Sequence, residues 1–176
     1  MTTALARIIG SELGAEAPEW IELIPAGAFT LRDGRGTFRL GDPAQVIARS
    51  FEMAGDSKIL VDIDHGADTK GGSSEAAGWI TQMEVREGAI WGRVEWTELG
   101  RAKIEGQLYR RISPVFAHQK GKTDVEFIVR AALVNNPAIA ELTALAASQE
   151  TEEIMDLTEP SLPHGTATTS SPEPWS

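Results

Sequence analysis

Two residues of this sequence, His65 and Ser113, carry side chains that could perform nucleophilic catalysis together. His65 ends the segment VDIDH, and Ser113 lies in the segment RRISPVF. A serine hydroxyl becomes an effective nucleophile when a base within hydrogen-bonding distance accepts its proton. Imidazole suits this role because its ordinary pKa is about 6.5. The two residue types therefore indicate acyl transfer, provided that the fold brings them together.

Both residues also have a structural interpretation. A single histidine at the end of a strand commonly has only a packing or hydrogen-bonding role. Pro114 follows Ser113 directly, and proline within a strand is typical of an edge strand or a bulge, where the serine would only satisfy a backbone group. The residue types alone leave catalytic and structural roles open.

A metal site is a further interpretation of the cluster around His65, because Asp62, Asp64 and Asp68 supply carboxylate ligands beside an imidazole. No second well-placed histidine accompanies the cluster. Alternation along a strand also separates His65 from Asp62 and Asp64. The glycine-rich segment 69–78 lacks the spacing of a phosphate-binding loop. We therefore expect neither a metal nor a cofactor.

Short extended segments, rich in β-branched and aromatic residues and separated by turn residues, dominate the sequence. The segments that predict strands are 19–25, 57–64, 78–85, 89–96, 110–116 and 125–134. Segments 43–55 and 97–106 have helical spacing and end in glycine, and REGA at 86–89 predicts a hairpin turn. This pattern predicts a strand-dominated α+β fold, a mainly antiparallel sheet or barrel with two or three helices.

The 176 residues are enough for one domain, which we place at residues 17–147. Residues 1–16 are expected to form an N-terminal extension. Asn136 and Pro137 predict the start of a last helix. Residues 148–176 are rich in Ser, Thr, Pro and Glu, which predicts a disordered acidic tail.

Composition excludes several classes of protein. The chain has no cysteine and a formal charge of −10, and its last basic residue is Arg130. An acidic chain without a basic cluster is a poor ligand for nucleic acid. No segment has the length and apolar character of a membrane span. We therefore expect no nucleic-acid partner and no membrane, and a reducing cytoplasm suits the lack of cysteine.

The order of several motifs resembles that of the Mu-type phage I protein family, the proteases of prohead maturation. The motifs are WIELIPAGAFTLRDGR, ILVDIDH, AAGWI, VEWTELGRAKI, YRRISPVF and RAALVNNPAI, and they extend from about Trp20 to Ala140. The resemblance implies a fold like that of herpesvirus assemblin, a β-barrel with flanking helices. It also implies that Ser113 is the nucleophile and His65 the base.

The third member of the site departs from the pattern that the resemblance implies. Relatives of this fold have a histidine or an acidic residue where this chain has Arg130, and a guanidinium cannot accept the imidazole N–H. Asn135 is the preferred substitute, because its amide carbonyl can hold the imidazole tautomer. Glu126 and Asp64 are the alternatives, unless the site works as a dyad.

The function that the resemblance implies is a serine endopeptidase of phage prohead assembly. Its substrates would be the major capsid protein and the scaffold protein, and cleavage of the chain itself and self-association are further expectations. The protein would act inside the assembling prohead, in the host cytoplasm. The alternative is a non-enzymatic capsid scaffold or assembly factor that retains the protease fold.

Overall fold

The computed structural model describes residues 2–8, 10, 12–68 and 74–135. The strands of this part are β1 (Thr3–Arg7), β2 (Trp20–Ile24), β3 (Ala28–Leu31), β4 (Gly36–Arg39), β5 (Ile59–Ile63), β6 (Gly78–Arg86), β7 (Ala89–Trp96), β8 (Arg111–Gln119) and β9 (Phe127–Val134). The helices are α1 (Pro43–Ala54), α2 (Glu98–Glu105) and the short 3₁₀ turn η1 (Gly66–Asp68).

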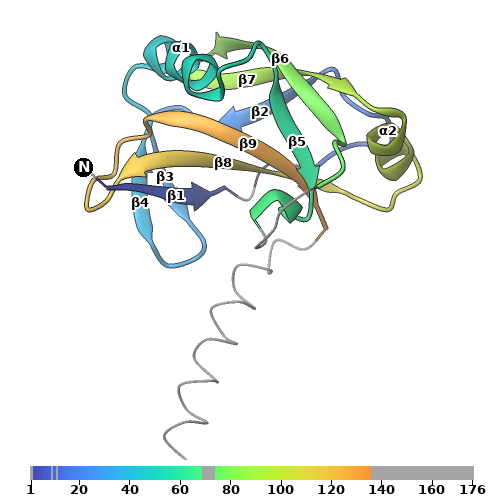
Figure 1. Cartoon of the computed structure of the whole chain (residues 1–176). Coiled ribbons are helices and arrows are strands. Elements are labelled where there is room, and N and C mark those ends of the chain that lie inside the picture. The colour runs from blue at the N-terminus through green and yellow to red at the C-terminus, as the bar shows by residue number, and fades with distance from the viewer. Residues whose placement is uncertain (1, 9, 11, 69–73, 136–176) are drawn as a thin grey trace, which may run out of the picture. The chain divides into compact units, whose positions relative to one another are not determined.

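Seven strands form one sheet in the order β1-β8-β9-β5-β6-β7-β2, and β3 pairs with β4 in a separate hairpin (Figure 1). Neighbouring strands are antiparallel except β5 and β9, which are parallel. The sheet curls into a half-barrel, with β1 at one end of the strand order and β2 at the other. The predicted strand-dominated α+β class is confirmed.

The segments predicted to be strands all form strands, and the two predicted helical segments contain α1 and α2. The hairpin turn between β6 and β7 is also confirmed. Glu87 and Gly88 both have positive φ in this turn (49° and 83°). Two-residue hairpin turns whose twist matches that of the strands require positive φ at both positions. The helix expected after Asn136, the expected tail at 148–176 and residues 69–73 of the glycine-rich segment lie outside the described residues.

The expected domain boundary at residue 17 leaves out one strand of the sheet. β1 pairs with β8 from Thr3, opposite Gln119, to Arg7, opposite Val115. The backbone pairing continues beyond β1, because the N–H of Gly10 donates to the carbonyl of Ile112. The sheet therefore includes residues of the N-terminal segment.

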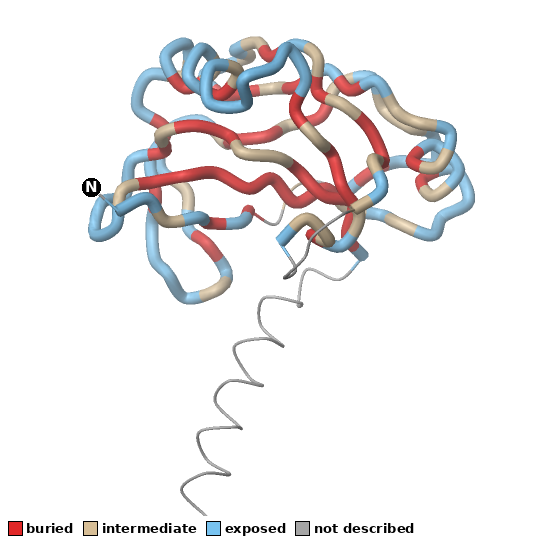
Figure 2. Tube along the Cα trace, in the orientation of Figure 1, coloured by how far each residue is buried: buried red, intermediate tan, exposed pale blue. Residues whose placement is uncertain are grey.

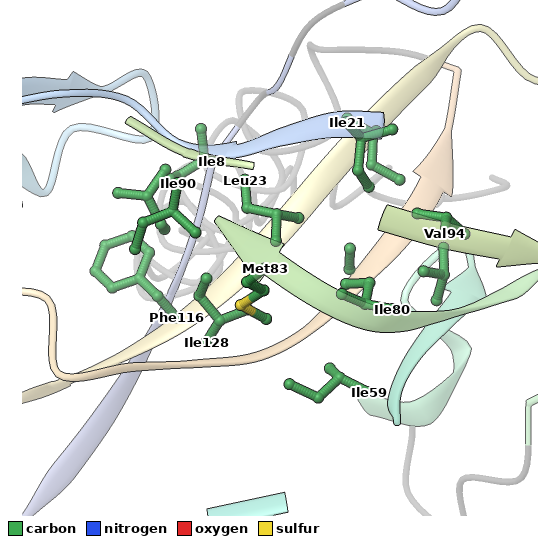
Figure 3. Packing of buried hydrophobic residues seen from close by; sticks show 14 of the residues in the cluster. Ile8, Ile21, Leu23, Ile59, Ile80, Met83, Ile90, Val94, Phe116 and Ile128 are labelled. Atoms are coloured by element: carbon green, nitrogen blue, oxygen red, sulfur yellow. The ribbon is translucent and has the colours of Figure 1, made fainter. Parts of the chain in front are cut away.

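One apolar cluster fills the concave side of the sheet. Figure 3 shows side chains of β2, β6, β7, β8 and β9 meeting there, among them Leu23, Met83, Ile90, Phe116 and Ile128. Helix α1 packs against β9 and β6. Figure 2 shows β8 buried along most of its length, so the strand that carries Ser113 is a central part of the fold.

Pro114 does not mark an edge strand, because β8 lies between β1 and β9. The carbonyl of Pro114 accepts a hydrogen bond from the N–H of Ile8 in the β1 direction. In an antiparallel ladder the N–H and C=O of one residue point to the same neighbouring strand. The N–H that proline lacks is therefore missing only on the β1 side of β8. The pairing of β8 with β9 is intact at Pro114, and a bulge follows at Val115 and Phe116.

Candidate active site

The sheet register places Asp62, Ala132 and Ser113 in one row across three neighbouring strands. Asp62 in β5 is opposite Ala132 in β9, and Ala132 is opposite Ser113 in β8. Residues paired in this way point to the same face of the sheet. Two strand spacings, about 10 Å, separate Asp62 from Ser113. A side chain from the end of β5 must therefore pass over β9 to reach the serine.

The turn after β5 carries His65 back over this row. Asp64 and His65 both adopt left-handed backbone conformations, with φ of 53° and 54°. Such conformations are unfavourable for residues other than glycine and concentrate at functional sites. The N–H of Asp64 donates to the carbonyl of Leu133, and the N–H of Ala67 donates to the carboxylate of Asp62 at 2.9 Å. These bonds attach the turn to the sheet on both sides of His65.

His65 and Ser113 contact each other through their side chains. Nε2 of His65 lies 3.0 Å from Oγ of Ser113, although the residues are 48 positions apart in the chain. His65 is 8% exposed and Ser113 is 5% exposed. A neutral imidazole whose Nε2 is unprotonated can accept the serine hydroxyl hydrogen at this distance. The geometry therefore suits nucleophilic attack by the Ser113 oxygen.

The surroundings of His65 keep its imidazole neutral. Burial lowers the pKa of His65 to about 4, and the positive charges of Arg7 and Arg130 contribute, against an opposing effect of Asp64. Burial also raises the pKa of the Asp62 carboxyl. The hydrogen bond from Ala67 and the charges of Arg130 and Arg7 oppose this rise. The base is thus in its proton-accepting form well below neutral pH.

This environment predicts the pH dependence of any reaction that needs neutral His65. Because protonation removes the base, kcat/KM should persist as pH falls through 6.5 and decline near pH 4. The measurement is a pH profile of kcat/KM, with circular dichroism at each pH to show that the chain stays folded. In the Arg7→Gln variant the pH of this decline should rise toward 6.5, because one of the positive charges that lower the pKa of His65 is removed. An acid limb of the wild-type pH profile near 6.5 would contradict the lowered pKa of His65.

The residues expected to orient His65 have other hydrogen-bond partners. The side-chain amide of Asn135 accepts a hydrogen bond from the backbone N–H of Arg110 and donates to the carbonyl of Leu108. Asp64 accepts the hydroxyl of Tyr109, and Glu126 accepts the amide of Gln119. The structure therefore brings Ser113 and His65 together but leaves Asn135, Asp64 and Glu126 with other partners.

An acidic residue that the sequence reasoning considered only as a metal ligand lies beside His65 instead. Oδ2 of Asp68 is 3.8 Å from Nδ1 of His65. The same carboxylate forms ion pairs with Arg7 of β1 and Arg130 of β9. The spacing from His65 to Asp68, three residues across a turn, is the sequence signal that could have indicated this contact.

The acidic residues around His65 do not gather as ligands. Asp62 faces the N–H of Ala67 and Asp64 faces Tyr109, on separate sides of the turn. In the described part of the chain, no group of three or more His, Cys, Asp or Glu side chains could hold a metal ion. Among the same residues, no helix has the length and apolar character needed to cross a membrane.

The fold and the site together therefore define a strand-dominated domain in which a buried serine contacts a histidine side chain. Residues 21–146 match the family described as "Mu-like prophage I protein, N-terminal domain". The chain belongs to this family, as the motif order predicted.

Two relatives have assigned names. The chain is 33% identical over 147 residues to "Protease I" of Escherichia phage Mu, and 31% identical over 146 residues to "Mu-like prophage FluMu I protein" of Haemophilus influenzae. These alignments include 73% and 72% of this chain, and they span 40% of the length of each relative. No solved structure matches the chain.

Proposed function

We propose that this chain is a serine endopeptidase in which Ser113 is the nucleophile and His65 the general base. The observation that carries the proposal is the buried contact of 3.0 Å between Nε2 of His65 and Oγ of Ser113. The name of the phage Mu relative, Protease I, supports peptide hydrolysis as the reaction. An assemblin-like fold, which the motif order implies, is part of the same proposal.

In the proposed reaction the Ser113 oxygen attacks the carbonyl carbon of a peptide bond while Nε2 of His65 takes the hydroxyl proton. The tetrahedral intermediate collapses as the C–N bond breaks, and His65 returns that proton to the leaving amine. Water then enters, and His65 removes a proton from it as the oxygen attacks the Ser113 ester. The acid product leaves, the proton returns to Ser113 and the enzyme is restored.

The substrates that we propose are the major capsid protein and the scaffold protein of the assembling prohead, in the host cytoplasm, together with the chain itself. This assignment rests on the family, whose matched relative in phage Mu is named a protease. The catalytic unit that we propose includes β1, because Arg7 contacts the acidic residue beside His65. The proposed acidic tail, 148–176, follows it.

Covalent labelling tests the nucleophile directly. A fluorophosphonate probe should phosphonylate Ser113, giving one mass addition that peptide mapping places on residues 111–119. His65→Ala should suppress the labelling, because the hydroxyl loses its base. Ser57→Ala is the matched control, since Ser57 is an exposed serine that bonds to Asp56, and it should label like the wild type. Labelling at another serine, or none at Ser113, would contradict the proposal.

Co-expression tests the substrates. The wild type should convert the capsid and scaffold proteins of its phage to shorter products with defined masses, and Ser113→Ala should leave them intact. Assembly of normal heads without any cleavage would instead favour the non-enzymatic scaffold or assembly factor. Labelling of Ser113 without cleavage of the capsid protein would support the proposed nucleophile and contradict the proposed substrates.

A further inference from the structure

The second ring nitrogen of His65 has no hydrogen-bond partner within the described residues, although it is buried. A neutral imidazole carries one proton, and when Nε2 accepts from Ser113 that proton must be on Nδ1. A buried N–H without an acceptor is costly. The arrangement is therefore incomplete unless an acceptor approaches Nδ1.

Asp68 is placed to be that acceptor. Its Oδ2 is 3.8 Å from Nδ1, slightly beyond a hydrogen bond. Catalytic hydrogen bonds are often long in the absence of substrate and shorten when it binds. The backbone N–H of Asp68 donates to the carbonyl of His65 at 2.9 Å, so the turn fixes the two residues relative to each other.

Two arginines from different strands hold the Asp68 carboxylate. Arg7 in β1 and Arg130 in β9 are both opposite Val115 in β8, so they lie in one row and point to the same face of the sheet. Arg7 is 2.7 Å from Oδ2, and Arg130 forms an ion pair with Oδ1. Bidentate or paired guanidinium contacts restrict a carboxylate in position as well as in charge. Asp68 is thereby held against His65.

Among the described residues, Asp68 is the only carboxylate within ion-pair distance of His65. Oδ2 of Asp62 accepts the N–H of Ala67, which holds η1 in place, while Oδ1 of Asp62 is buried and has no hydrogen-bond partner among the described residues. Asp64 is exposed and accepts the Tyr109 hydroxyl. The contact with Asp68 also gives a role to Arg130, which stands where the resemblance implies a histidine or an acidic residue. Arg130 cannot orient the imidazole itself, but it holds the carboxylate that can.

We propose that Asp68, clamped by Arg7 and Arg130, is the positioning residue of the site and accepts the Nδ1–H of His65. This inference rests on the proposed function, since it concerns the same Ser113 and His65 pair. Asp68 remains a carboxylate throughout the reaction. Its effect is to keep the proton on Nδ1, so that the unprotonated Nε2 faces Ser113.

Kinetics give the first test. Asp68→Asn should lower kcat by about 10²-fold or more and change KM by less than about threefold, because the imidazole tautomer is wrong while the binding surface is unchanged. Asp68→Glu keeps the carboxylate and should recover activity to within about tenfold of the wild type. Asp124→Asn, an exposed aspartate that pairs with Arg39, is the matched control and should stay within about twofold. Equal effects of the Asn and Glu variants, or none, would overturn the assignment.

Arg130→Gln separates an indirect role of the guanidinium from a direct one. With Arg7 still holding the carboxylate, we expect a smaller loss of kcat than in Asp68→Asn. A loss larger than that of Asp68→Asn would contradict the clamp, because it would mean that Arg130 acts on the substrate rather than through Asp68.

Nitrogen-15 NMR of His65 tests the same contact without any substrate. The wild type should show a protonated Nδ1 and an unprotonated Nε2 near pH 7, and Asp68→Asn should shift protonation toward Nε2. Labelling of Ser113 in the wild type together with an unchanged tautomer in Asp68→Asn would reject the positioning role and keep the proposed function. If Ser113 is not labelled but the tautomer changes as expected in Asp68→Asn, the proposed function would be contradicted and the contact between Asp68 and His65 would be supported.

Discussion

Replacing Ser113 by alanine is expected to lower kcat/KM for peptide hydrolysis by about 10⁴-fold or more. The substitution removes the only oxygen that the 3.0 Å contact presents to Nε2 of His65, and no acyl-enzyme can form without it. The measurement is hydrolysis of a fluorogenic peptide built on the cleavage junction that co-expression identifies. Thermal unfolding should show a folded chain, because the change removes one small polar atom.

The pair should also behave as one unit. His65→Ala is expected to lose nearly as much activity as Ser113→Ala, and the double variant little more than either, because both changes disable the same step. Ser57→Ala should again match the wild type. Losses that multiply in the double variant would mean that the residues act in separate steps, which contradicts the assigned roles.

The sheet strands that the sequence predicted are those with a strong pattern of their own. β5 to β9 include long runs of β-branched and aromatic residues, and they form the centre of the sheet. β1 (TALAR), β3 (AFTL) and β4 (GTFR) were missed because each contains at most two β-branched or aromatic residues. A short strand is stabilised mainly by its neighbours, here β8 for β1, and a local pattern does not contain that information.

The site was predictable in part. The types of His65 and Ser113 indicated a nucleophile and a base, and the order of motifs paired them. The role of Asp68 was not visible, because strand alternation was extended to His65. In the structure β5 ends at Ile63, and the left-handed conformations of Asp64 and His65 turn the chain back over the sheet. Asp68 thereby meets arginines from β1 and β9, which lie 61 and 62 positions away from it in the sequence.

From the strand register we infer that the imidazole of His65 passes over Ala132 to reach Ser113. Ala132 lies between Asp62 and Ser113 in the row of paired residues and is fully buried, and we expect its small methyl group to leave room over β9 for the imidazole. A larger side chain at this position would occupy the path of the ring. The row therefore makes the size of residue 132 a condition for the contact between the base and the nucleophile.

Ala132→Val is accordingly expected to lower kcat/KM by about 10²-fold, since a displacement of about 1 Å can have that effect on positioned groups. The matched control is Ala131→Val, on the opposite face of the same strand and also fully buried. Overpacking should destabilise both variants similarly, by about 1 to 3 kcal/mol. Only Ala132→Val should lose activity and phosphonylation of Ser113 per folded molecule, measured at a temperature where both are folded. Equal activity in the two variants would mean that the imidazole does not pass over Ala132.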